Sequence, residues 1–449
     1  MKTQLTLCIS GTLLLVGMSG CEKTPERPMN VVYILADDLG YGDVGCYGQQ
    51  IIKTPNIDRM AKEGMLFTQH YAGCTVSAPS RCSLMTGLHT GHTQVRGNRE
   101  ITPEGQQPMR EDTYTLGKLM KSAGYTTGIF GKWGLGNPGS VSIPNKMGFD
   151  EFYGYNCQRQ SHSFYPDHLW HNEEKVLFPE NENNACKTYS QDLIHEQALK
   201  FIRDHKEQPF FAMLTYTLPH AELNLPHDSI YKMYENSFEE TPYIGKFDKV
   251  YGGYNTSEKP LASFAAMVSR LDKYVGDVMA ELKELGLDKN TIVIFTSDNG
   301  PWLTEHENGG SAGPLKDGKG TWWEGGFRVP AICWMPGKIN PAINDEIMTS
   351  MDLYPTFLSM AGIEQPKDLV LDGVNQTGLL FEEKHSARDE VYYWWGSELM
   401  AIRKGEWKYY FKTIKDQYLR TCKIETPAEP LLYNVETDIS ERFNQAEKH

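Results

Sequence analysis

Two uninterrupted apolar runs, far apart in the chain, each lead directly into a cluster of oxygen-bearing side chains. Residues 31–36 (Val-Val-Tyr-Ile-Leu-Ala) are followed by two aspartates, and residues 291–296 (Thr-Ile-Val-Ile-Phe-Thr) are followed by Ser-Asp-Asn-Gly. Such runs are typical of strands buried on both faces, as in parallel sheets covered by helices. The carboxyl ends of parallel strands meet at one edge, where such folds bind their ligands. The sequence therefore predicts an α/β fold that brings distant carboxylates together.

The remaining pattern extends this sheet and flanks it with helices. Residues 125–130 and 209–216 are further strand candidates, and helices are predicted over 55–63, 77–87, 116–122, 191–205 and 264–285. Residues 137–189 show no clear periodicity and are expected to be irregular, and a loop region of that length is usually functional. After about residue 375, short alternating stretches predict a small antiparallel sheet. We therefore expect a large domain over 29–375, with a central mixed, mostly parallel sheet, and a C-terminal subdomain over 376–449.

The N-terminus has the features of an export signal. Lys2 precedes an apolar run over 5–18, which is too short to span a bilayer comfortably. The run ends in Met-Ser-Gly-Cys, which resembles a bacterial lipobox. We expect a lipoprotein signal peptide over 1–21, a lipid anchor on Cys21 and a polar tether over 22–28. The chain would then be an exported bacterial lipoprotein, in the periplasm or on the outer-membrane surface; an ordinary cleaved signal peptide is the alternative.

Charge and cysteine content narrow the classes of partner. The formal net charge of −14 disfavours nucleic acid or an anionic membrane surface as a partner. An anionic small molecule would need a local positive pocket in this acidic surface. Apart from Cys8 and Cys21, seven cysteines remain, and an odd number leaves at least one free thiol.

The stretch from Cys74 to Gly87 is the strongest candidate for chemistry. Pro79 suits a first helical turn and Gly87 suits a helix end, so Ser77 is expected at a helix N-terminus. Exposed N–H groups and the helix dipole favour an anion there. Taken alone, this pattern also fits a plain N-cap serine.

The whole stretch, Ser-Ala-Pro-Ser-Arg followed by Leu-Met-Thr-Gly, resembles the signature of the type I sulfatases, a family within the alkaline phosphatase superfamily. The resemblance implies an alkaline phosphatase-like fold. It also implies that Ser77 is oxidised to formylglycine (3-oxoalanine), which then serves as the nucleophile. A radical-type serine maturase would carry out this oxidation before export, and Arg81 would steady the formylglycine and the metal site.

The carboxylates after the two apolar runs resemble the metal ligands of the same family. Carboxylate and amide oxygens are the ligands that calcium and magnesium prefer. The resemblance implies one divalent cation, Ca²⁺ or Mg²⁺. The expected ligands are Asp37, Asp38, Ser77, Asp298 and Asn299.

Two lysines and a histidine complete the expected catalytic set. Residues 131–136 (Gly-Lys-Trp-Gly-Leu-Gly) resemble the family's Gly-Lys-Trp-His-Leu-Gly, in which the lysine contacts the sulfate and the histidine contacts the formylglycine. Lys132 matches this lysine, but Gly134 replaces the histidine. Lys319 lies in a second family segment and would hold a sulfate oxygen. His220, with His227 as its alternative, would protonate the departing alcohol.

Recognition of a sugar is expected from the aromatic and cationic side chains around the signature. The loops over 96–110, 157–190 and 301–312 would set specificity. The candidate substrate-binding residues are His89, His92, Arg96, His162, Trp170, Trp302 and His306.

The resemblance implies a sulfatase that hydrolyses O-sulfate esters on a sulfated polysaccharide or glycosaminoglycan, so that the partner is a sulfated carbohydrate. Two alternatives stay open. One is a phosphomonoesterase or phosphodiesterase of the same superfamily with an unmodified serine nucleophile. The other is a non-catalytic lipoprotein that binds sulfated glycans.

Overall fold

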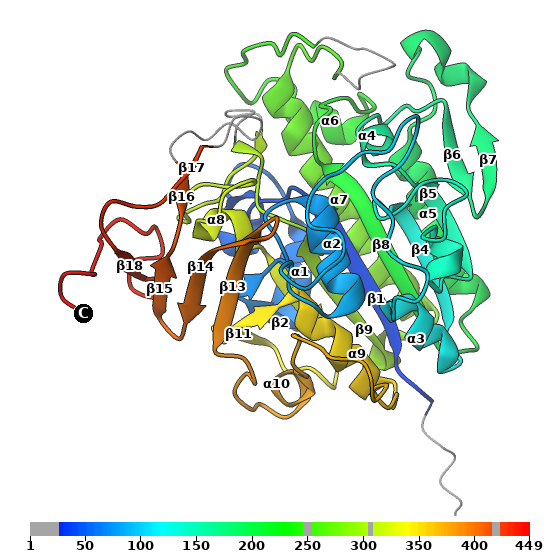
Figure 1. The fold of residues 1–449 in the computed structure, drawn as a ribbon. Helices are drawn as coiled ribbons and strands as arrows, with labels where there is room; N and C mark the ends of the chain where they lie inside the picture. The colour runs from blue at the N-terminus through cyan, green and yellow to red at the C-terminus, as the bar shows by residue number, and fades with distance from the viewer. Residues whose placement is uncertain (1–26, 246–253, 304–308, 415–422) are drawn as a thin grey trace, which may run out of the picture.

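A ten-stranded mixed sheet crosses the middle of the protein, in the order β11-β2-β10-β9-β1-β8-β4-β5-β6-β7 (Figure 1). The computed structural model describes residues 27–245, 254–303, 309–414 and 423–449. The central strands from β9 to β5 are parallel, whereas β10, β6 and β7 run antiparallel to their neighbours. The strands of this sheet are β1 (Asn30–Asp37), β2 (Met65–Phe67), β4 (Thr126–Lys132), β5 (Glu151–Tyr155), β6 (His168–His171), β7 (Glu174–Leu177), β8 (Phe210–Pro219), β9 (Thr291–Ser297), β10 (Ala331–Trp334) and β11 (Ala342–Asn344).

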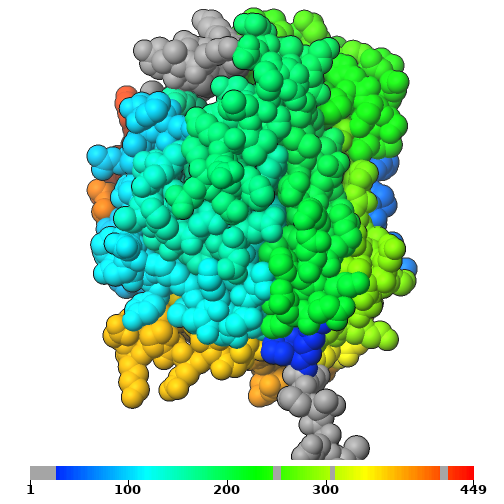
Figure 2. Space-filling view, turned by 90° about the vertical axis from the view of Figure 1, so that its right-hand side faces the viewer, coloured from blue at the N-terminus to red at the C-terminus, as the bar shows by residue number. Residues whose placement is uncertain are grey.

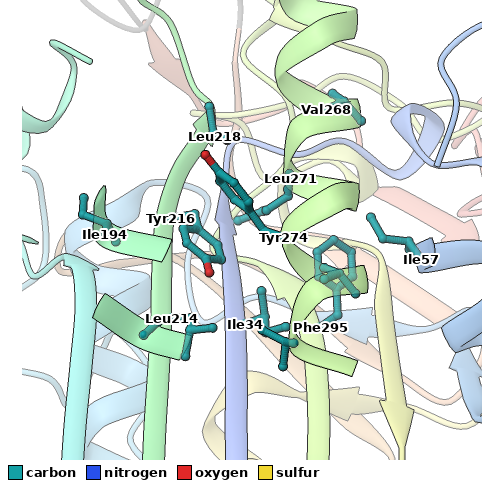
Figure 3. Packing of buried hydrophobic residues seen from close by; sticks show 14 of the residues in the cluster. Ile34, Ile57, Ile194, Leu214, Tyr216, Leu218, Val268, Leu271, Tyr274 and Phe295 are labelled. Atoms are coloured by element: carbon teal, nitrogen blue, oxygen red, sulfur yellow. The ribbon is translucent and has the colours of Figure 1, made fainter. Parts of the chain in front are cut away.

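Successive residues of β1 face opposite sides of the sheet, and helices cover each side. Val32 and Ile34 pack with α1, α5 and α7, whereas Val31 and Leu35 pack with α2, α3, α9 and α10. Figure 3 shows the first of these clusters, in which Ile34 and Tyr274 point into the layer between sheet and helix. This three-layer arrangement explains why the strands are apolar throughout. The helices are α1 (Pro55–Glu63), α2 (Ser77–Thr86), α3 (Leu116–Ser122), α4 (Gln158–Ser161), α5 (Ser190–Asp204), α6 (Ser229–Lys232), α7 (Pro260–Glu284), α8 (Glu324–Phe327), α9 (Leu353–Met360) and α10 (Thr377–Phe381).

The four predicted strands and five predicted helices all occur, with ends that differ by a few residues. The expectation of an irregular segment over 137–189 was wrong, because this segment forms β5, α4, β6 and β7. The last two are four residues long and lie at the edge of the sheet. Half of their side chains are polar and the strands are short, so they lack the continuous apolar run that reveals a buried strand.

A separate four-stranded antiparallel sheet lies within the predicted C-terminal subdomain, at the left of Figure 1. Its order is β13-β14-β15-β18, as the alternating stretches after residue 375 predict. Its strands are β13 (Glu390–Trp395), β14 (Glu398–Lys404), β15 (Trp407–Tyr410) and β18 (Leu431–Asn434). Two short pairs complete the strands, β3 (His70–Tyr71) with β12 (Met348–Thr349), and β16 (Thr413–Ile414) with β17 (Ile424–Glu425).

The middle of the chain builds the face at the right of Figure 1. In the view of that face, the cyan-to-green part of the chain covers most of the surface (Figure 2). The C-terminal sheet lies mainly on the other side of the molecule. The large domain therefore separates this face from the C-terminal subdomain.

The predicted signal peptide and Cys21 lie outside the described residues, which begin at Arg27, and so does most of the predicted tether. None of the described helices combines the length and apolar character that crossing a membrane requires. Six cysteines in the described part of the chain are free thiols, in agreement with the expectation of at least one.

Candidate active site

The two aspartate-bearing strands deliver their polar residues to one point. β1 and β9 are parallel neighbours, so the residues after their carboxyl ends lie side by side. Asp37 ends β1, and Asp38 follows in the left-handed region with φ +63°. The backbone N–H of Asp38 donates to Asp298 Oδ1 at 3.4 Å, and the Asn299 amide donates to Asp38 Oδ1 at 2.7 Å. The predicted meeting of distant carboxylates is thus confirmed.

Ser77 is the first residue of α2, as predicted, and the helix ends at Gly87, whose φ is +67°. The Ser77 hydroxyl does not cap the helix. Instead, Ser77 Oγ donates to Asp37 Oδ1 at 3.0 Å and lies 3.4 Å from Asn299 Oδ1. The interpretation of Ser77 as a plain N-cap serine is therefore wrong, because its oxygen points at the strand ends.

Lys132 and Lys319 approach this point from two other segments. Lys132 ends β4, and its Nζ lies 3.2 Å from Ser77 Oγ and 2.6 Å from Asp37 Oδ2. Lys319 Nζ donates to both oxygens of Asp38 at 2.7 Å. Both lysines are buried, so the positive charge is concentrated inside the site.

Arg81 lies one helical turn after Ser77 on α2. Its Nε and Nη2 bind Asp298 Oδ2 at 3.0 and 2.9 Å, and its Nη1 donates to the Lys132 carbonyl at 2.9 Å. The guanidinium therefore joins the helix, the end of β9 and the end of β4, which a single planar fork of donors can do.

His220 directly follows β8 and reaches the site from the next strand of the sheet. Its Nδ1 donates to the Ala221 carbonyl, which leaves Nε2 facing Asp38 Oδ2 at 3.3 Å. The His162 ring stacks on it at 4.0 Å. The Trp302 ring lies 5.4 Å from His220 and 5.0 Å from Lys319 Nζ. Two of the predicted substrate-binding residues, His162 and Trp302, thus lie at the site.

Opposite charges set the ionisation of the buried groups. Burial opposes ionisation of Asp37, but the charges of Lys132 and Arg81 outweigh it and hold the pKa of Asp37 well below its usual range. Burial, with the Asp37 charge, raises the pKa of Asp298 to about 6. Burial and then Lys319 hold the pKa of His220 well below its usual value, so its imidazole is neutral in this environment.

The donor set fits a divalent cation. Asp37, Asp38 and Asp298 are at most 2% exposed, and three carboxylates buried together repel one another unless cations lie among them. The Asn299 amide adds a fourth hard oxygen donor. These four residues would hold Ca²⁺ or Mg²⁺, since both bind carboxylate and amide oxygens.

The family comparison agrees with this geometry. Residues 29–363 match the family model described as "Sulfatase", and residues 386–449 match that of the C-terminal region of aryl-sulfatase. The chain belongs to the sulfatase family. As a sulfatase it is a sulfuric ester hydrolase, and the expectation from the signature around Ser77 is confirmed at the level of the family.

Curated relatives and a solved structure resemble this sulfatase along most of its length. It is 34% identical over 420 residues to dog N-acetylgalactosamine-6-sulfatase, covering 88% of this chain and 73% of the relative. It is 31% identical over 446 residues to human arylsulfatase A, covering 93% of this chain and 83% of the relative. The structure of Ps i-CgsB in complex with k-i-k-neocarrahexaose superposes with a TM-score of 0.77 at 29% identity, covering 94% of this chain and 89% of that one.

Three other predicted substrate-binding residues of the sulfatase lie beyond the end of α2. His92 Nδ1 lies 2.9 Å from Asp372 Oδ2, and the His89 ring stacks between His92 and Trp394. Arg96 binds the Thr93 carbonyl at 2.9 Å and Ser397 Oγ at 3.2 Å. The contacts with Trp394 and Ser397 join the segment after α2 to the C-terminal subdomain, and the role of these residues in substrate binding stays a prediction.

Trp170 and His227 have partners of their own away from the site. Trp170 Nε1 donates to Glu104 Oε1 at 2.6 Å, and the His227 ring stacks on Tyr231 at 3.9 Å. The structure therefore favours His220 over His227 as the histidine of the site. His306 lies outside the described residues.

One residue that supports the site was missed at the sequence level. Asn98 Oδ1 accepts a hydrogen bond from the backbone N–H of Ala78 at 2.9 Å, next to Ser77. It thereby holds one of the free N–H groups at the start of α2. The only sequence signal is its place in the Arg-Gly-Asn segment after the signature, and no residue spacing links it to Ala78.

Proposed function

We propose that this sulfatase hydrolyses O-sulfate esters on a sugar of a sulfated polysaccharide or glycosaminoglycan. Two observations support a sugar substrate. One curated relative is named for an N-acetylgalactosamine sulfate, and the solved neighbour is described with a neocarrahexaose bound. In this chain, the ring of Trp302 borders the site and offers a flat apolar surface on which a sugar can stack.

The proposal includes conversion of Ser77 to formylglycine and one divalent cation, Ca²⁺ or Mg²⁺. Formylglycine would supply a carbonyl carbon that carries two hydroxyls when hydrated, one to attack sulfur and one to release the sulfate. Asp37, Asp38, Asp298 and Asn299 would hold the cation, which lowers the pKa of a neighbouring hydroxyl and offsets its charge.

The residues around position 77 would bind and polarise the sulfate group. Lys132 and Lys319 approach from two different segments of the chain and would hold sulfate oxygens while negative charge develops on them. Arg81 keeps the end of β4 and Asp298 in place. His220 Nε2 is the group that would pass a proton to the leaving alcohol, and the charge of a bound sulfate ester would favour its protonation.

The observation that carries the proposal is the position of Ser77 Oγ. It lies at the start of α2, within 3.2 Å of both Lys132 and Asp37. The test is the mass of the peptide that contains Ser77, from protein produced together with a serine-type maturase. A loss of two hydrogens at this residue, together with hydrolysis of an aryl sulfate, is the expected result. An unmodified serine, with the maturase active on a control substrate, would contradict the formylglycine.

We further propose that the enzyme is exported as a lipoprotein through Cys21, to the periplasm or the outer-membrane surface. The Met-Ser-Gly-Cys segment supports this proposal. Cells grown with labelled palmitate should yield a labelled protein in the membrane fraction, and Cys21→Ala should abolish the label. An unlabelled native protein would contradict the lipid anchor.

A further inference from the structure

Gly134 leaves room beside the site that another residue fills. Its φ is +72°, and a Cβ at this position would lie 3.1 Å from Gln158 Cγ and 3.2 Å from Gln158 Nε2. The family's segment has a histidine at this position. The side chain of Gln158 therefore lies where a side chain at position 134 would begin.

The Gln158 amide has a fixed orientation and an unused donor. Gln106 Nε2 donates to Gln158 Oε1 at 3.4 Å, while Gln106 Oε1 accepts from the Gln158 backbone N–H at 3.3 Å. Turning the Gln158 amide over would place two NH₂ groups against each other, so Nε2 faces away from Gln106. This Nε2 is buried and has no hydrogen-bond partner in the part of the chain that the structure describes.

Leaving such a donor unpaired is costly. Gln158 is 4% exposed, and a buried donor without an acceptor destabilises the folded protein. Each buried polar group without a hydrogen-bond partner in a native protein calls for an explanation. A partner that joins the site only in the mature enzyme would provide one.

The neighbours of Gln158 place it at the catalytic edge of the sheet. The backbone N–H groups of Trp133 and Gly134 donate to the carbonyls of Tyr155 and Asn156, at 2.9 and 3.2 Å, so β4 and β5 leave the sheet together. Lys132, two residues before Gly134, contacts Ser77. His162, four residues after Gln158, stacks on His220.

We propose that Gln158 Nε2 donates a hydrogen bond to the oxygen of residue 77 in its aldehyde or hydrated form, and so takes over the contact that the family's histidine makes. This inference rests on the proposed formylglycine. An amide donates but takes up no proton near neutral pH. Gln158 therefore orients the oxygen, and any proton that leaves it must go to another group.

The first test is Gln158→Leu in the matured enzyme. This change removes the donor and keeps most of the volume. We expect kcat for an aryl sulfate to fall about 10- to 100-fold and KM to change less than about threefold. Gln158→Glu keeps an acceptor for Gln106 but loses the donor when ionised, and should lose kcat similarly. An unchanged kcat with a lowered melting temperature would show a purely structural role and overturn the inference.

A second readout does not depend on turnover. If Gln158 stabilises the hydrated form, the Leu variant has more free aldehyde at residue 77 and reacts faster with an aminooxy probe. If Gln158 donates to the aldehyde oxygen instead, the Leu variant reacts more slowly, and an equal labelling rate would contradict the proposed contact.

Two glycines provide a matched backbone pair. Gly134→Ala pushes a methyl group against Gln158, whereas Gly139→Ala has a similar φ of +77° and no atom within 4 Å of its Cβ. Both carry the same type of strain, but only Gly134→Ala should lower kcat. Equal kcat values in the two variants would argue against Gln158.

The failure of this inference and that of the proposed function are distinguishable. If the native enzyme has an unmodified Ser77 and no sulfatase activity, the proposed function is contradicted. A native enzyme that is modified and active, with a Gln158→Leu variant that equals it, would remove only the role of Gln158.

Discussion

Single residues at this site act through charge. Three buried carboxylates face Lys132, Lys319 and Arg81, and each of these cations binds one of the carboxylates. The net charge of the chain is −14, yet the positive charges lie at the bottom of the site. With a divalent cation bound, the site would carry a net positive charge, which would attract an anion although the protein as a whole is acidic.

Lys319→Ala tests this arrangement. Lys319 is the cation on Asp38, and its loss should lower kcat/KM for a sulfate ester about 100- to 1000-fold, because a charge that stabilises the transition state is removed. Lys316→Ala is the matched control. Lys316 Nζ lies over the Trp323 ring at 3.3 Å, so this variant should keep kcat/KM within about twofold. Equal losses in the two variants would contradict the assignment of Lys319.

Glu222 gives a prediction about pH and stability. Burial raises the pKa of Glu222 to about 7, from a usual value of 4.5. Between these two pH values the folded protein binds more protons than the unfolded chain, so the free energy of unfolding falls as pH rises. Glu222→Gln should match the native protein at pH 4.5 and be more stable at pH 8, on the order of 2 kcal/mol.

Urea unfolding at several pH values measures this difference. Glu173→Gln, at an exposed position, should show no comparable change with pH. A constant difference between native protein and Glu222→Gln across the range would rule out the raised pKa.

Sequence motifs identified most of the candidate site residues, because each of them directly follows a predictable strand or lies in a family segment. Ser77, Lys132, Lys319 and His220 all reach the site in this way. Gln158 was not identified from the sequence, because it is an uncharged residue in a segment without periodicity. Its importance comes from the space beside Gly134, which only three-dimensional packing shows.

At the scale of elements, a buried charge network joins β15 to the segment that carries Lys319. Lys408 Nζ donates to Glu324 Oε1 at 2.9 Å and lies 3.1 Å from Glu441 Oε1. All three side chains are fully buried. Glu324 begins α8, five residues after Lys319, so the C-terminal subdomain anchors the segment that carries Lys319.

Lys408→Met should destabilise the protein by about 3–5 kcal/mol, because it removes the cation that lies between two buried carboxylates. Urea unfolding measures the loss. Lys404→Met, on the neighbouring strand β14, removes a lysine that is 66% exposed and should change the stability by less than about 0.5 kcal/mol. A loss below 1 kcal/mol for Lys408→Met would show that the network is not what holds α8.

The regular elements followed from the sequence wherever one side of a strand or helix faces the core. The β6–β7 hairpin was not predicted, because its strands are short, half polar and at one end of the sheet. The contact between Lys408 and Glu324 also escaped prediction. Both residues are charged and would be expected at the surface, and only the packing of the two sheets buries them.

At the scale of the whole molecule, a divalent cation would join segments that are distant in sequence. Removal of bound metal with a chelator should therefore lower the melting temperature by at least about 3 °C, because a ligand that binds only the folded state stabilises it. Added Ca²⁺ or Mg²⁺ should restore it, and the ion that does so more strongly identifies the preferred metal. Asp298→Asn should weaken the response. A melting temperature that ignores both chelator and metal would contradict the site.

The fold as a whole was predictable because parallel strands bring their carboxyl ends to one edge. The residues that meet there come from β1, β4, β8, β9 and the start of α2. Their distances were not predictable, because Arg81 and Lys132 reach the carboxylates through side-chain conformations that depend on the packed core.

The burial of Ser77 has a consequence for the order of events in the cell. This serine is 1% exposed and lies within a helix packed against the sheet. If Ser77 is oxidised as proposed, the enzyme that does so would need access to an extended stretch of chain and would act while the polypeptide is still unfolded. Folding would then bury Ser77 and prevent its oxidation. A molecule that folds before this step would stay inactive until it unfolds again.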